Sequence, residues 1–489
     1  MSTPIPMLDL MFFLTESVEN PRHVGSVLIF KPPRGGANAA REIVAAYRRA
    51  QPKPPFNRIP VFLKAGLPEW QEVERIDPRH HVLHIALPPP GTDAQLHELI
   101  ADLHAPMLER HRPGWKVYII EGLADGRFAI YHKVHHALVD GESGMAILRR
   151  SLADSPRDRR IRATVGLDHP ARPRPAPHGL RDTLEREAQR LARRTLSVGR
   201  GSIRVAGEAL EGLWGYSPER KRAFTAPQTP MNEPIYNARA IAHTTLPLAA
   251  MKKVARAWDA TLNDVALCLL DSGINRYLAA MGRKPDHPLV AICPVSLHDP
   301  QAKQATTNVS AIWPVLGPVS APIQRRLETV KSSTRAEKAR LGSLGKEAAY
   351  SYAVMAFALS ETLTIARPEA LGLRPANMLI SNVRGPERPL YLNGARLETF
   401  FPVSTLIAGL GLNITFMSYA DQMVFGYTAN GSALPEVESM ARYTAEAFEA
   451  LQRASAKKRA AAEGRTIRRR PAASAKQTRR RARRPSLRA

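Results

Sequence analysis

Three histidines and an aspartate lie close together in residues 127–144, RFAIYHKVHHALVDGESG. They are His132, His135, His136 and Asp140. A neutral imidazole can take a proton from a hydroxyl group at neutral pH, because its reference pKa lies near 6.5. A hydroxyl group that loses its proton in this way can attack an activated acyl carbonyl. The segment is therefore a candidate site for general-base chemistry.

Two other interpretations of the same residues stay open. A zinc site needs three or four converging ligands, and no helical HxxxH pair or cysteine partner supports one at this spacing. The histidines can also satisfy buried polar groups at the end of a strand. No serine or cysteine on a GxSxG turn lies beside the segment, so direct acyl transfer is favoured over a covalent acyl-enzyme.

The elements around the histidines are expected to be a strand and a helix. Apolar residues within 128–134 predict a buried strand, and the segment GMAILRR suits a helix. At such a junction the rigid elements hold a side chain while the loop exposes it. Asp140 is expected to fix the turn by binding an arginine or backbone amides, and Gly141 to permit a tight backbone path at the helix start.

The chain as a whole predicts an α/β fold with mixed sheets flanked by helices. Strand-like runs alternate with helical patterns in residues 1–152 and again in 233–454. Residues 153–232 begin with a stretch rich in Pro and Arg and continue into a long helical pattern at 180–194. We therefore expect two α/β halves joined by a crossover segment.

The charge of the chain is concentrated at its C-terminus. The 489 residues carry 70 Lys and Arg against 44 Asp and Glu, and residues 455–489 hold 14 of the basic residues with Glu463 alone against them. Such a tail is expected to be disordered, because it cannot bury enough apolar surface. It is either a solvated extension or a contact for an anionic membrane or lipid-droplet surface. Nucleic acid is disfavoured, since no aromatic residues interrupt the run.

Several classes of protein are disfavoured by what the sequence lacks. Cys268 and Cys293 are too few for a disulfide framework, which indicates a reducing compartment, and both are expected in the core. Residues 1–16 lack the positive region of a secretory signal. The uncharged stretches 306–324 and 399–420 are interrupted by Pro or Gly and predict internal strands, not spanning helices. Without a Walker or GxGxxG motif, nucleotide chemistry is disfavoured. We expect a cytoplasmic protein with at most peripheral membrane contact.

A family resemblance rests on several motifs spread over residues 5–450. His135, His136, Asp140 and Gly141 spell HHxxxDG, and this resembles the acyltransferases related to chloramphenicol acetyltransferase. The chain as a whole is similar to the bacterial wax ester synthase/diacylglycerol acyltransferase family. Further matching motifs are the opening segment 7–30, RPGW at Arg112–Trp115 with Gly114 where Leu is usual, FTAPQTPMNEPI, TLND with Asn263 and Asp264, PVSL at Pro294–Leu297, NVRGP at Asn382–Pro386, and GLGLNITFMSY at Gly409–Tyr419.

The resemblance implies two chloramphenicol-acetyltransferase-like halves and an acyl-CoA-dependent O-acyltransferase. Its expected product is triacylglycerol, made from diacylglycerol and a long-chain acyl-CoA. A long-chain alcohol, giving a wax ester, is the alternative acceptor. The alternative of another class is a non-catalytic coat protein of lipid inclusions or membrane surfaces. Acyl-CoA would be a co-substrate, with no metal and no permanently bound cofactor, and the oligomeric state is left open.

The resemblance also implies roles for individual residues. His136 is the expected base, His135 a supporting neighbour, and Asp140 and Gly141 are structural. The site is expected between the halves, with acyl-CoA and the lipid arriving from opposite faces. Asn263 has two interpretations, a hydrogen bond to the thioester or oxyanion and an N-cap of the following helix. Asn382 is expected to be a turn residue, with Arg384 and Gly385 stabilising the contact between the halves.

Overall fold

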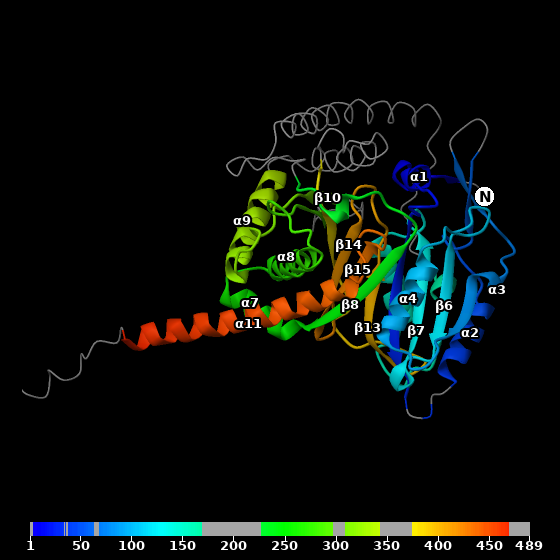
Figure 1. The fold of residues 1–489 in the computed structure, drawn as a ribbon. Helices are drawn as coiled ribbons and strands as arrows, with labels where there is room; N and C mark the ends of the chain where they lie inside the picture. The colour runs from blue at the N-terminus through cyan, green and yellow to red at the C-terminus, as the bar shows by residue number, and fades with distance from the viewer. Residues whose placement is uncertain are drawn as a thin grey trace, which may run out of the picture.

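The computed structural model describes residues 3–33, 35, 38–62, 68–168, 226–296, 309–342 and 374–468 (Figure 1). Within these ranges the strands form two six-stranded sheets and one three-stranded sheet. The strands of the small sheet, in spatial order, are β1 (Thr3–Pro4), β4 (Glu69–Glu72) and β3 (Arg58–Val61).

The first six-stranded sheet holds the segment with the histidines. Its spatial order is β12-β13-β2-β7-β6-β5, with β5 and β6 parallel and the other neighbours antiparallel. The central strands are largely apolar and buried, as expected of strands covered on both faces. The bounds are β2 (His23–Lys31), β5 (Val82–Ala86), β6 (Trp115–Glu121), β7 (Phe128–His135), β12 (Tyr391–Leu392) and β13 (Ala395–Val403).

The helices of this part of the molecule are short and amphipathic. Helix α2 buries Ile43, Val44 and Tyr47, and α4 begins with a capping box between Thr92 and Gln95. The bounds are α1 (Met7–Leu14), α2 (Ala39–Arg49), α3 (Pro78–His81), α4 (Asp93–His104) and α5 (Gly141–Ser151).

The second six-stranded sheet has the order β10-β9-β11-β14-β15-β8 and is also mixed. Strand β11 runs parallel to β9 and β14, and the remaining pairs are antiparallel. The bounds are β8 (Arg239–Pro247), β9 (Ala291–Ser296), β10 (Val309–Ile312), β11 (Met378–Arg384), β14 (Leu412–Tyr419) and β15 (Gln422–Asn430). The predicted α/β class with mixed sheets is confirmed.

Helix α8 is the central helix of the second part. It is apolar on nearly all sides and packs against both α9 and α11, which explains why so few of its residues reach solvent (Figure 1). A capping box between Thr261 and Asp264 fixes its start. The bounds are α7 (Leu248–Ala257), α8 (Leu262–Ala280), α9 (Ile323–Gly342) and α11 (Val437–Arg468).

The boundary drawn at residue 233 does not separate the two large sheets. Strands β12 and β13, from within the predicted half 233–454, belong to the first sheet, where β13 pairs with β2 from Arg396↔Lys31 to Val403↔Gly25. The apolar pattern of 395–403 predicts a strand but carries no information about its partner. The prediction of two consecutive halves is therefore wrong for this segment.

The predicted tail 455–489 also begins too early. Helix α11 continues to Arg468, and its alanine-rich sequence favours that continuation. Trp258 holds the helix at residues 455–458. Its indole N–H donates to the Ser455 hydroxyl at 2.8 Å, and the centroid of its ring lies 4.1 Å from the Lys458 ammonium. Residues 469–489, like the predicted helix at 180–194, lie outside the described residues.

The described helices include none that combines the length and the apolar character needed to cross a bilayer. Cys268 and Cys293 are both buried and unbridged, as expected of core residues. Burial raises the pKa of both thiols, that of Cys293 to about 12. Neither is suited to act as a thiolate nucleophile.

Candidate active site

The HHxxxDG segment connects a central strand to a helix, as predicted. His135 is the last residue of β7 and pairs in register with His23 of β2, and α5 begins at Gly141. The amide of His136 donates to the carbonyl of Arg22 at 2.9 Å. The loop is thus anchored at its start to the segment that precedes β2.

His135 is buried, and one of its ring nitrogens forms a hydrogen bond. Its Nδ1 accepts from the Ala137 amide at 3.2 Å, which leaves a ring proton on Nε2. Nε2 lies 3.5 Å from a carboxylate oxygen of Glu16, and the ring stacks on Phe13 with centroids 4.1 Å apart. These contacts fix the ring, and they fit the predicted supporting role better than that of a base.

Glu16 is the site residue that the sequence interpretation missed. Its side chain is 0% exposed, and its two oxygens also accept from the Arg22 amide at 3.2 Å and the Arg110 guanidinium at 3.3 Å. Burial opposes ionisation, but the contacts with His135, Arg22 and Arg110 outweigh it and lower the pKa of Glu16. The one local sign of Glu16 in the sequence is a carboxylate that closely follows an apolar run. The sequence does not show which residue that carboxylate contacts.

His136 lies in different surroundings. Its ring stacks on Phe12 with centroids 4.2 Å apart, and the residue is half-buried. Its Nδ1 is buried and has no hydrogen-bond partner among the described residues. Burial is the main cause that lowers the pKa of His136 to about 4, so the imidazole is neutral at physiological pH. The neutral imidazole is the form of the ring that can accept a proton.

Asp140 and Gly141 start the helix that follows. The Asp140 carboxylate caps α5 by accepting from the Ser143 amide at 2.8 Å, which agrees with its predicted structural role. Gly141 differs from expectation, because its backbone is not in the left-handed region and a Cβ there would meet no atom within 4 Å. The backbone path does not itself require glycine. Gly141 is exposed, and a Cβ there would point into open space.

The third histidine of the segment belongs to the packing of the sheet. The Tyr47 hydroxyl of α2 lies 3.2 Å from His132 Nε2, on the opposite face of β7 from His135. Burial lowers the pKa of His132 to about 4. For this residue the structural interpretation, a buried polar group satisfied by a neighbour, agrees with the contacts.

Asn263 is not the helix cap. Thr261 is the N-cap of α8, and its hydroxyl accepts from the Asp264 amide at 3.1 Å. The Asp264 carboxylate accepts from the Thr334 hydroxyl at 2.7 Å, which ties α8 to α9. Asn263 is the second residue of the helix and is half-exposed. The cap interpretation of Asn263 is therefore wrong, whereas its suggested contact with the thioester or oxyanion stays a prediction.

The NVRGP motif is also placed differently from expectation. Asn382 is an exposed residue within β11 and not a turn residue, and Arg384 pairs with Glu387 at the surface. Gly385 directly follows β11, and a Cβ there would lie 2.1 Å from the Ser418 carbonyl oxygen of β14, the neighbouring strand of the same sheet, and 3.5 Å from the Phe400 ring of β13 in the first sheet. Close approach to the backbone of β14 accounts for this glycine.

Two family profiles match the chain. The wax ester synthase/diacylglycerol acyltransferase catalytic domain matches residues 5–266, and the C-terminal domain of the same family matches residues 307–452. The chain belongs to this family. The predicted enzyme class, acyltransferase, is thereby confirmed at the level of the family.

Individual relatives agree with the family assignment. "Probable diacyglycerol O-acyltransferase Tgs4" from Mycobacterium tuberculosis H37Rv is 34% identical over 462 residues, which are 92% of this chain and 96% of the relative. The solved wax ester synthase/diacylglycerol acyltransferase from Marinobacter aquaeolei VT8 matches with a TM-score of 0.75 and 28% identity, covering 93% of this chain and 100% of that one. The first condensation domain of the calcium-dependent antibiotic synthetase shares the fold, with a TM-score of 0.55 at 15% identity over 93% of this chain and 96% of that domain.

Gly114, the departure from the RPLW motif of the acyltransferase family, lies directly against His135. Its carbonyl accepts from the His135 amide at 2.8 Å, and a Cβ at this position would lie 3.1 Å from the His135 Cβ. A small cavity opens beside this contact, and its walls include Phe13, Pro60, Trp70, Leu108, Gly114, His135 and Leu138. Gly114 therefore forms part of the wall beside the first histidine.

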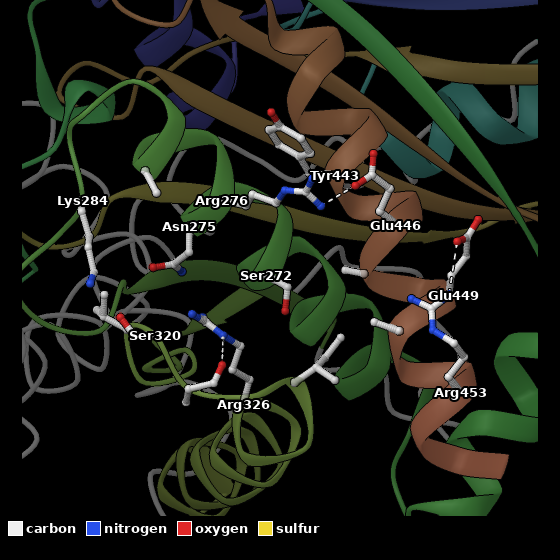
Figure 2. A pocket seen from close by; sticks show the side chains of 16 residues that line it. Ser272, Asn275, Arg276, Lys284, Ser320, Arg326, Tyr443, Glu446, Glu449 and Arg453 are labelled. Atoms are coloured by element: carbon white, nitrogen blue, oxygen red, sulfur yellow. Dashed lines mark hydrogen bonds and ion pairs between the residues drawn. The ribbon is translucent and has the colours of Figure 1, made fainter. Parts of the chain in front are cut away.

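A groove of about 680 Å³ in the acyltransferase lies elsewhere, between α8, α11 and the segment that leads into α9 (Figure 2). Its rim carries ion pairs, including Arg276 with Glu446 and Arg453 with Glu449. None of the histidines of the HHxxxDG segment lines it. We assign no part of the acyl-transfer site to this groove.

Proposed function

We propose that this acyltransferase esterifies diacylglycerol with a long-chain acyl group from acyl-CoA, giving triacylglycerol and free CoA. Support comes from the family match and from relatives named diacylglycerol O-acyltransferases. A long-chain alcohol is the competing acceptor, since the family description covers wax ester synthases as well. Both acceptors carry a hydroxyl group that can attack the acyl-CoA thioester.

His136 is the proposed general base. The acceptor hydroxyl gives its proton to the ring as its oxygen attacks the thioester carbonyl carbon, and a tetrahedral intermediate forms. The carbon–sulfur bond then breaks, and the protonated ring returns the proton to the departing CoA sulfur. The carrying observation is the difference in burial between the two histidines: His135 is 3% exposed, with its ring against Glu16 and Phe13, whereas His136 is half-buried and its imidazole is neutral.

The other residues are proposed to position this base. Glu16 and Phe13 hold the His135 ring, and the His135 backbone leads directly into His136. Asp140 sets the start of α5, and the open space at Gly141 is proposed to receive part of a substrate. Asn263 is proposed to donate to the thioester or the oxyanion. We further propose that acyl-CoA and lipid approach through a passage between the two sheets.

The decisive experiment replaces the base. His136→Ala is expected to lower turnover by about 10² to 10⁴-fold, the usual contribution of a positioned general base. The assay follows a labelled long-chain acyl-CoA into triacylglycerol or wax ester with diacylglycerols and long-chain alcohols offered separately. Circular dichroism of the same sample reports whether the variant is folded.

The matched control is His111→Ala, because His111 is 73% exposed and lies outside the site. It is expected to keep full activity. A folded His136→Ala protein as active as the control would exclude His136 as the base. Absence of acyl transfer by the unmodified protein with every acceptor would favour the non-catalytic coat protein.

The basic C-terminus is proposed to attract anionic lipid surfaces and to make the enzyme peripheral to the membrane or to lipid inclusions. The exposed start of this region, Lys457 to Arg459 on α11, adds to the charge of residues 469–489. Each basic residue near an anionic membrane contributes about 1 kcal/mol, and salt screens the contribution. Flotation with vesicles that contain phosphatidylglycerol, at low and at high salt, tests this proposal.

A further inference from the structure

The large hydrophobic residues left exposed by the described part of the chain gather around one segment. They are Leu14 (64% exposed), Val18 (62%), Tyr236 (57%) and Phe62 (45%). Leu14 ends α1, and Val18 lies in the connector of residues 15–22 that leads from α1 to β2 (Figure 1). The other two residues reach the same place from distant parts of the sequence.

Contacts of neighbouring residues place the four close to one another, and we call them the α1 patch. The Phe62 ring lies edge-on to Phe13, the neighbour of Leu14, with centroids 5.9 Å apart. On the other side, Arg239 donates to the carbonyls of Tyr236 and Glu19, and Glu19 follows Val18 in the chain. Exposed apolar residues that cluster in this way mark an interaction site more often than scattered single residues do.

The connector that displays the patch is held firmly. Arg22 donates to the Thr15 carbonyl at 3.3 Å and to the Leu406 carbonyl at 2.7 Å. The Thr405 hydroxyl donates to the Pro21 carbonyl at 3.1 Å. Because these bonds tie the connector to residues that follow β13, the apolar side chains are exposed on a fixed support rather than on a free loop.

The α1 patch adjoins the histidines. Phe12 stacks on His136, Phe13 stacks on His135, and Leu14 is the next residue of the same helix. One short helix therefore reaches from the surface to the proposed base. An acceptor that leaves a lipid phase at Leu14 is separated from His136 only by the apolar residues of α1, Phe13 and Phe12.

The charges around the patch are largely compensated. Arg110 pairs with Glu16 at 3.3 Å, and both His111 and Arg112 lie within 3.2 Å of Glu109. The binding free energy of a partner at this patch therefore comes mainly from apolar contact and little from net charge. A tyrosine at the edge of the patch fits the interface between headgroups and acyl chains, where tyrosine is enriched.

We propose that the α1 patch docks on the surface of a phospholipid bilayer by inserting Leu14, Val18 and Phe62. The docking itself does not depend on the acyl transfer proposed above, whereas its purpose, delivery of a lipid acceptor to His136, rests on it. The mode differs from that of the basic C-terminus, because apolar insertion persists at salt concentrations that screen charges.

The test is flotation of the full chain with vesicles of phosphatidylcholine alone, in about 0.1 M and about 1 M salt. The unmodified protein is expected to float in both. The double variant Leu14→Glu/Val18→Glu is expected to bind at least about tenfold more weakly, since each inserted side chain loses its apolar contact. Vesicles containing phosphatidylglycerol form the second arm, in which binding lost at high salt reports the basic C-terminus.

Ala280→Glu is the control, because this exposed residue at the end of α8 receives one of the two added charges at a place outside the patch. It is expected to float like the unmodified protein. Equal flotation of the double variant and this control on phosphatidylcholine would overturn the proposal. So would a patch-dependent dimer in solution without vesicle binding, measured by sedimentation, which would assign the patch to a second copy of the chain.

An activity arm separates this proposal from the proposed function. With a water-soluble short-chain alcohol as acceptor, the double variant is expected to match the Ala280→Glu control. With diacylglycerol in vesicles it is expected to fall in step with its binding. Loss of transfer to the soluble alcohol in a folded double variant would contradict a docking role. Inactivity of every protein, with flotation as expected, would overturn the acyl-transfer proposal and leave the docking intact.

Discussion

At the scale of single residues, two adjacent histidines differ because of what each ring contacts. His135 is buried against Glu16 and Phe13, whereas His136 is half-buried and stacks on Phe12. Motif spacing predicted the candidate histidines, because it places them directly in the sequence. It could not predict Glu16, which approaches His135 across more than a hundred residues of chain, since spacing carries no information about such contacts.

The lowered pKa of His136 leads to a prediction about pH. A base must be unprotonated, and burial shifts the protonation of His136 to about pH 4. The value of kcat/KM is therefore expected to stay level from about pH 8 down to about pH 6, where a solvent-exposed histidine would already be losing activity. Initial rates over this range, at pH values where circular dichroism is unchanged, provide the check. An acidic limb with its midpoint near pH 6.5 would contradict the neutral, buried environment assigned to the ring.

At the scale of elements, the sequence predicted the type of most helices and strands but not their ends or their partners. Strands such as β2, β6 and β7 and helices such as α2 and α8 were recognisable from apolar periodicity. The end of α11 was not, because the composition of residues 455–468 suits both a charged tail and an alanine-rich helix. Contacts of Ser455 and Lys458 with Trp258, which no local pattern reveals, extend the helix.

Two glycines of the family motifs allow a test of this packing. Gly385→Ala is expected to destabilise the protein by roughly 1 to 3 kcal/mol, because its Cβ must displace the backbone of β14. Gly141→Ala is the matched comparison and is expected to leave the free energy of unfolding unchanged or slightly raised, since it meets open space at a helix start. Urea unfolding of both variants measures the difference. Equal stabilities would refute the assignment of Gly385 to a close contact with the backbone of β14.

At the scale of the whole molecule, composition and periodicity predicted the α/β class, and the family resemblance supplied the pair of related halves. The exchange of β12 and β13 into the first sheet could not be read from the sequence, because strand patterns are the same in either sheet. The patch at α1 was likewise hidden, since its four residues come from separate segments.

The buried histidines predict sensitivity of the whole fold to acid. Burial lowers the pKa of each below 6.5, so the unfolded chain binds protons first as the pH falls, and stability is lost from about pH 6.5 downward by up to about 1.4 kcal/mol per pH unit for each group. Asp271 has the opposite effect, because its pKa is raised to about 6 and its protonation at lower pH favours the folded state. It is one group against several histidines. The histidines are His23, His81, His104, His132, His136 and His243.

Thermal unfolding followed by circular dichroism at constant ionic strength measures this effect. The midpoint temperature is expected to fall continuously between pH 7 and pH 5. A midpoint that stays constant over this interval would show that these rings protonate in the native state without cost.

The pairing of β13 with β2 also has a consequence for biosynthesis. The strand beside the histidines has an open edge until residues 395–403 have left the ribosome, when most of the chain has been made. A nascent N-terminal segment thus carries an unpaired, apolar edge of the kind that promotes aggregation. The sheet that carries the HHxxxDG segment is thus completed only after most of the chain has been made.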